Sequence, residues 1–134
     1  MNKILGLFIF YFIIGVANTI LTEIYIPIAH LPGGDVGMMS ILIAVGSLIF
    51  LALALVIVIA VTLLKLKLTY VKGIIVYFAI YFILTGFEAI NNIFDDLETA
   101  YLQLNVVLLL IPLLLGIISI LIAKRLDSNA KNAQ

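Results

Sequence analysis

The sequence contains no cysteine and no tryptophan, and only one histidine among its 134 residues. The absence of cysteine excludes disulfides, thiolate metal sites and cysteine nucleophiles. The one histidine, His30, stands just before Pro32 without a second histidine or a glutamate at metal-ligand spacing, so we interpret it as a turn residue. The serines have no histidine to activate them. No phosphate-binding glycine loop, haem motif or nucleotide motif is present, so we expect no enzyme, no cofactor and no metal site.

Charge is scarce as well. Charged residues make up 10% of the chain, compared with ~25% in an average soluble protein. Hydrophobic residues make up 66%. A water-facing surface needs many groups that hydrate well, and this chain cannot supply them. We therefore expect its outer surface to contact lipid, other copies of the chain, or both.

Four long apolar segments fill most of the sequence. Runs such as Val36–Leu64 and Thr99–Ala123 carry no charge. They far exceed the ~5–6 residues of an ordinary strand, and helices of this length, at about 1.5 Å per residue, cross a ~30 Å hydrocarbon layer. We therefore predict an all-α fold, a four-helix bundle of membrane-spanning-length hydrophobic helices, in one domain made of two helical hairpins. The predicted helices cover residues 4–29, 36–64, 69–94 and 99–125, and a polar tail covers residues 126–134.

The charged residues separate by sign once the chain is followed through alternating crossings. One end of the bundle, the basic end, receives Lys3, Lys65, Lys67, Lys72, Lys124, Arg125 and Lys131. The opposite, acidic end receives Glu23, Asp35, Glu88, Asp95, Asp96 and Glu98. Asp127 is the one acidic residue that stays with the basic group. In a membrane protein this pattern satisfies the positive-inside rule and predicts both termini in the cytoplasm.

One ionisable residue could work inside a bilayer. Glu88 lies within the predicted third helix, about two turns from its end, and a small transporter would need such a group. Its closeness to the acidic turn favours a hydrated position at the membrane edge instead. Amides such as Asn18 and Asn105 are expected to form hydrogen bonds between helices rather than a substrate path.

The whole chain resembles a family of viral coat proteins. Its length, four Ile/Leu/Val-rich helices, lack of Cys and Trp, Pro32-Gly33-Gly34 turn and polar tail are similar to the hydrophobic four-helix major capsid proteins of large tailed spindle-shaped viruses of hyperthermophilic archaea. The resemblance implies a virion coat of many copies that forms helical strands around a double-stranded DNA genome. It also implies that subunits lodge in the host membrane before assembly. No functional residue is carried over from the family.

A second interpretation stays open, in which the chain is a four-span integral membrane protein such as a small transporter, a holin or an accessory membrane subunit. Small multidrug transporters rely on a glutamate well inside their first helix, where this chain has only apolar residues and Asn18. Holins share the size and the basic tail. In the coat interpretation, we expect the basic end to face the DNA, because gathered positive charge binds phosphate without regard to sequence.

Overall fold

The computed structural model describes residues 3–30, 38–86, 90 and 99–132, and these residues form helices and no strand. The elements are α1 (Lys3–Ile28), α2 (Met39–Leu63), α3 (Tyr70–Tyr81), the π-helical segment η1 (Phe82–Gly86) and α5 (Thr99–Asn132). The predicted all-α class is confirmed. Three of the helices, α1, α2 and α5, are long and apolar enough to cross a membrane.

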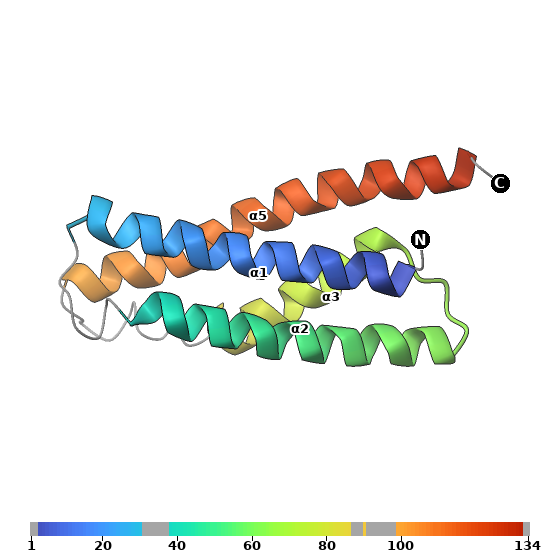
Figure 1. Ribbon diagram of the computed structural model, residues 1–134, viewed down its shortest axis with the longest axis horizontal. Coiled ribbons are helices and arrows are strands. Elements are labelled where there is room, and N and C mark those ends of the chain that lie inside the picture. Colours follow the sequence, from blue (N-terminus) through green and yellow to red (C-terminus); the bar gives the residue numbers. More distant parts are fainter. Residues whose placement is uncertain (1–2, 31–37, 87–89, 91–98, 133–134) are drawn as a thin grey trace.

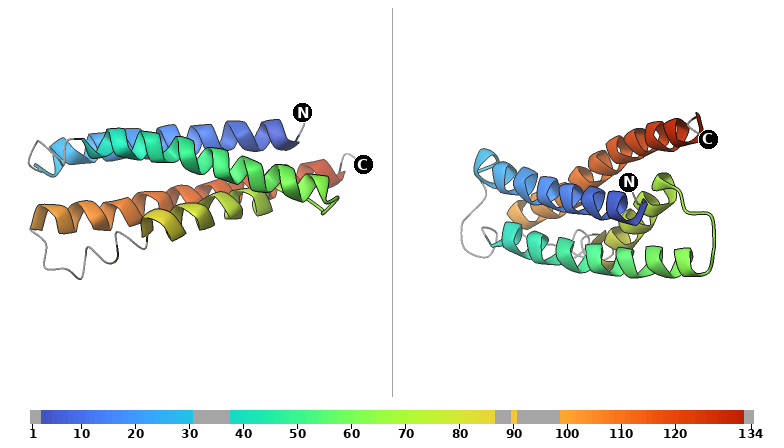
Figure 2. Two further views of the ribbon diagram at one scale, coloured as in Figure 1. Left: turned by 90° about the horizontal axis from the view of Figure 1, so that it is seen from below. Right: turned by 45° about the vertical axis from the view of Figure 1, so that its right-hand side comes forward.

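The helices run side by side along the long axis of the molecule (Figure 1). The start of α1, the connection between α2 and α3, and the end of α5 lie at the same end. Figure 2 shows two layers, with α1 and α2 over α3 and α5. Helix α1 packs mainly on α2, and α3 packs mainly on α5. The two layers are joined by contacts of α3 with α1 and α2 and by contacts of α5 with α1.

Aromatic side chains fill the space between the layers. Tyr11 of α1 stacks on Tyr77 of α3 with ring centroids 5.0 Å apart, and its hydroxyl donates a 2.8 Å hydrogen bond to a backbone carbonyl of α3. Tyr81 of α3 packs edge-on against Phe50 of α2, and its hydroxyl donates to the carbonyl of Leu108 in α5 at 3.0 Å. These rings combine a large apolar body with a hydroxyl that finds a partner. Tyrosines thus connect α3 to each of the other helices.

Glycines set the close approach of α1 to α3. A Cβ atom added at Gly73 would lie 2.5 Å from the buried side chain of Leu7, and one added at Gly6 would lie 2.6 Å from the hydroxyl of Tyr70. Neither distance is compatible with an alanine unless the neighbour moves. Small residues at such positions let helices pack closely, which matters where lipid removes the hydrophobic drive between helices.

Two helices end at residues in the left-handed region. In α2, the N–H of Leu66 donates to the carbonyl of Val61 at 3.1 Å, and Lys65 has a φ of 56°. This is a Schellman motif, with Lys65 at the position that glycine usually occupies. His30 follows α1 with a φ of 52°, and its N–H donates to the carbonyl of Pro27 at 3.2 Å. His30 is therefore a turn residue, as its sequence context predicts.

The last two helices depart from their predicted bounds. Helix α5 continues to Asn132 instead of ending at Arg125, so most of the predicted polar tail is helical. Within this extension, Asp127 contacts α3, as described below. Pro112 lies inside α5, fully buried, and the helix continues on both sides of it. In the predicted third helix, residues 87–89 and 91–94 lie outside the described residues.

Candidate functional site

The basic residues that the structure describes gather at one end of the bundle. Lys3 begins α1, Lys65 and Lys67 lie in the α2–α3 connection, Lys72 lies in the first turn of α3, and Lys124 and Arg125 lie near the end of α5. These elements meet at the same end of the molecule (Figure 1). All six side chains are exposed. Lys131 is in the last turn of α5, and its side chain lies outside the described residues.

Two of these lysines are held by backbone carbonyls of the α2–α3 connection. The ammonium of Lys3 donates to the carbonyl of Leu68 at 3.3 Å, and the ammonium of Lys72 donates to the carbonyl of Lys67 at 3.2 Å. Each ammonium has three donors, so both can also bind a phosphate or carboxylate from outside. The basic end is thus an accessible cationic surface.

Asp127, the one acidic residue of the basic end, caps α3. Its two carboxylate oxygens accept the backbone N–H groups of Tyr70 and Val71 at 3.0 and 3.1 Å. The Thr69 hydroxyl accepts the N–H of Lys72 at 3.2 Å and completes the cap. A helix N-terminus leaves such donors without partners and favours negative charge. Asp127 therefore joins α5 to α3, a role that its place in the sequence does not reveal.

Of the six residues assigned to the acidic end, the structure describes one. Glu23 is exposed and lies in α1 toward the end opposite the basic residues. The other five residues assigned to this end lie outside the described residues: Asp35, Glu88, Asp95, Asp96 and Glu98. Glu88, the one candidate for a working group within the bilayer, is among them.

Large apolar side chains cover the outside of the three long helices. Ile13 in the middle of α1 is 59% exposed, Val56 in α2 is 64% exposed and Leu114 in α5 is 59% exposed. Side chains of this kind recur along the full length of each helix. Soluble proteins rarely expose contiguous apolar surface of this extent. The sides of the bundle are built for an apolar environment, and the ends carry the charge.

The inner face of α1 is marked by polar and small residues instead of by greater hydrophobicity. Tyr11, Gly15, Asn18 and Thr22 follow one another at spacings of four, three and four, and all are buried. This helical spacing is the signal that could have found the inner face from sequence. Sequence reasoning missed it because the outer and inner sides of this bundle are both apolar.

Two buried polar atoms lack a hydrogen-bond partner within the described residues, Asn18 Oδ1 and Ser47 Oγ. A Cβ atom added at Gly15 would lie 3.5 Å from Ser47 Oγ and 3.8 Å from the Tyr77 hydroxyl, so these groups are close together. Asn18 is 3% exposed. Each of the two residues nevertheless faces a tyrosine of α3, Asn18 facing Tyr81 and Ser47 facing Tyr77, so the predicted interhelical contact of Asn18 is present without a hydrogen bond of ordinary geometry to its carbonyl oxygen.

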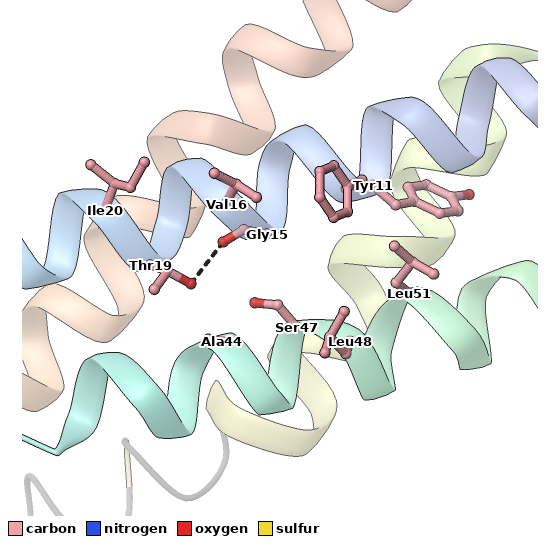
Figure 3. Close-up of a pocket in the computed structure, with 10 residues that line it drawn as sticks. Tyr11, Gly15, Val16, Thr19, Ile20, Ala44, Ser47, Leu48 and Leu51 are labelled. Carbon is pink, nitrogen blue, oxygen red and sulfur yellow. Dashed lines mark hydrogen bonds between the residues drawn. The ribbon is translucent and has the colours of Figure 1, made fainter.

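An apolar pocket opens beside these groups, between α1 and α2. Its volume is about 220 Å³, and residues of the two helices line it (Figure 3). Figure 3 shows Ser47 reaching from α2 toward Gly15 and Thr19, whose hydroxyl donates to the Gly15 carbonyl at 3.0 Å. The pocket lining contains no carboxylate, histidine or lysine. Its chemistry suits an apolar group and provides no acid, base or nucleophile pair.

A second apolar groove lies between α1 and α5, with a volume of about 330 Å³. It is lined by residues from Gly6 to Ala17 of α1, by residues from Leu115 to Leu126 of α5 and by Tyr70 of α3. Across the part of the chain that the structure describes, no group of three His, Asp or Glu residues could hold a metal ion.

Comparison with protein-family models, curated proteins and solved structures finds no match. The fold and the surface define the class directly: an all-α bundle with three helices of membrane-spanning length and an apolar outer surface.

Proposed function

We propose that the chain is a structural, non-enzymatic integral membrane protein whose basic end faces the cytoplasm. The observation that carries this proposal is the outward exposure of large apolar side chains along α1, α2 and residues 102–126 of α5. At about 1.5 Å per residue, the 26 residues of α1 and the 25 of α2 span more than the ~30 Å hydrocarbon core. Lipid is the environment in which this surface is stable.

The orientation of the bundle across the membrane is inferred from the position of its basic residues. Lysines and arginines near the ends of spans are retained on the cytoplasmic side, and all six described basic side chains lie at one end of the bundle. The cytoplasmic leaflet carries negative charge, to which each nearby cation contributes about 1 kcal/mol of attraction. In this account, the cationic surface holds the bundle against anionic headgroups.

Extraction of membranes with alkaline carbonate tests this proposal. Carbonate releases proteins that adhere to a membrane through charge, while an integral bundle stays with the lipid because its apolar sides cannot enter water. We expect the chain to remain in the membrane pellet after carbonate and to leave it only with detergent. Release by carbonate would contradict membrane insertion.

The coat protein suggested by the family resemblance is the second candidate. The apolar sides and the separate basic end also fit a subunit that packs laterally with many copies of itself, with double-stranded DNA at the cationic surface. A coat protein would dominate the mass of purified particles and co-purify with DNA. Finding the chain only in cell membranes, with no particle that contains it, would reject this candidate.

The two candidates respond differently to loss of charge. Replacing Lys65, Lys67 and Lys72 together with glutamine removes part of the cationic surface without touching the core, because all three side chains are exposed. In a coat, this variant should package less DNA and its particles should become more sensitive to salt. In a membrane protein that forms no particles, this variant should instead weaken the preference for inserting with the basic end in the cytoplasm.

A further inference from the structure

We infer that the groove between α1 and α5 binds a single anionic lipid, with one acyl chain in the groove and the headgroup between Lys3 and Arg125. This inference rests on the proposed membrane insertion and adds a ligand site to it. The groove is apolar and about 330 Å³ in volume, within the ~300–1,000 Å³ range of small-molecule sites.

The groove exists because α5 leaves α1 toward its C-terminus. Figure 1 and the right-hand view of Figure 2 show the C-terminal half of α5 diverging from α1. Asp127 holds α5 in this position through its hydrogen bonds to Tyr70 and Val71. The ring of Tyr70 forms part of the lining between the two helices. The opening is therefore fixed by a specific contact, and an acyl chain can fill it without rearrangement of the bundle.

The groove is about as long as one leaflet is thick, and a further apolar groove between the same helices, lined by residues within 21–28 and 111–118, continues from it toward the opposite end. Its α1 side runs from Gly6 to Ala17, which at 1.5 Å per residue is about 16 Å. Half of the ~30 Å hydrocarbon layer is about 15 Å. The groove begins one turn from Lys3, at the basic end, and ends near the middle of α1. It therefore coincides with the acyl region of the leaflet that borders the basic end.

Charge complementarity selects an anionic headgroup. Lys3 precedes Gly6 by three residues, and Arg125 follows Ile122 by three, so each cation lies on the helix face that lines the groove. Both are exposed. Lys124 is placed on another side of α5, and the carboxylate of the nearby Asp127 is directed to α3. A cation on each side of one opening suits a phosphate group, with the arginine able to bind two of its oxygens.

The test compares phosphatidylglycerol with phosphatidylcholine of the same acyl chains, bound to the full chain in neutral detergent and counted by native mass spectrometry. We expect one phosphatidylglycerol to be retained in preference to phosphatidylcholine. The variant Lys3→Gln/Arg125→Gln should lose about twenty-fivefold in that preference, since each cation near an anionic headgroup contributes about fivefold. The control Lys65→Gln/Lys124→Gln removes equal charge at exposed positions that do not line the groove, and it should change the preference by less than about twofold. Equal losses in the two variants would overturn the inference, because they indicate adsorption to the whole basic end.

A matched pair of substitutions tests the acyl chain position. Ile122 lines the groove and is 45% exposed, while its neighbour Leu121 is 57% exposed and does not line it. Ile122→Trp should reduce binding of both lipids by tenfold or more, and Leu121→Trp should not. No difference between the two would overturn the groove as the site. Carbonate extraction of the same proteins separates the two proposals, since release from the membrane defeats insertion, and retention without phosphatidylglycerol preference defeats only the lipid site.

Discussion

The carboxylate of Asp127 in α5 accepts the backbone N–H of Tyr70 at the start of α3 at 3.0 Å, across 57 positions of sequence. Its second oxygen accepts the N–H of Val71. One side chain thus satisfies two donors of a helix end, complements the helix dipole and fixes how α5 crosses the bundle.

Removing this cap should lower the stability of the bundle. We expect Asp127→Ala to reduce the free energy of unfolding by about 1–2 kcal/mol, the usual cost of a lost N-cap, and Asp127→Asn to cost less because its amide oxygen can still accept one bond. Thermal unfolding in detergent, followed by circular dichroism, measures both. Asn129→Ala, at an exposed position in the same part of α5, serves as the control. Equal melting temperatures for all three variants would show that the cap contributes nothing.

A glycine at position 65 should stabilise α2. Lys65 adopts a φ of 56°, which costs an ordinary residue about 1 kcal/mol and glycine very little. We expect Lys65→Gly to raise the free energy of unfolding by about 0.5–1 kcal/mol. Lys67→Gly, two residues away and not at positive φ, removes the same charge and should be neutral or destabilising. A lower melting temperature for Lys65→Gly than for Lys67→Gly would contradict the Schellman geometry.

Two glycine substitutions should have opposite effects. A Cβ at Gly73 would lie 2.5 Å from Leu7, which is fully buried, whereas a Cβ at Gly46 would meet Phe50 at an acceptable 3.4 Å. Gly73→Ala should therefore destabilise the bundle by about 1–3 kcal/mol through overpacking. Gly46→Ala should be neutral or stabilising by up to about 1 kcal/mol, because alanine is the better helix former. Chemical denaturation of the two variants in parallel decides whether α1 and α3 are as close as described.

The hydroxyl of Ser47 faces Tyr77 without a hydrogen bond of ordinary geometry, and this offers a different kind of test. A buried polar atom with a poor partner contributes little to stability, so Ser47→Ala should change the free energy of unfolding by less than about 1 kcal/mol. Tyr11→Phe is the comparison, since it removes a 2.8 Å hydrogen bond and should cost about 0.6–1 kcal/mol. If Ser47→Ala proved the more damaging of the two, Ser47 would have a partner in solution.

Much of the fold can be predicted from the sequence, because the lengths of the uncharged runs and the positions of the charged residues determine where the helices lie. The uncharged runs predict α1 and α2 to within a few residues at each end that the structure describes, and the alternating crossings bring Lys3, Lys72 and Arg125 to one end. Both results depend on chain length and polarity alone. They require no knowledge of side-chain packing.

The inner organisation does not follow from these signals. All four segments are apolar on every side, so hydrophobicity does not show which faces of the helices meet. The cap by Asp127 depends on a contact between distant parts of the chain, and the helix that carries it continues through most of the predicted polar tail. The left-handed conformation of Lys65 after α2 cannot be predicted from the sequence either, because glycine is the residue that usually marks this position.

The orientation of the bundle in a membrane can be measured directly, because the chain contains no native cysteine. Single cysteines at Lys67, Ile28 and Ile13 report on the basic end, the opposite end of α1 and its lipid-facing middle. A membrane-impermeant maleimide should label Ile28→Cys in intact cells, Lys67→Cys only after the membrane is opened, and Ile13→Cys only in denaturing detergent. Rapid labelling of Ile13→Cys in native membranes, or labelling of both end positions from the same side, would contradict an inserted bundle with a cytoplasmic basic end.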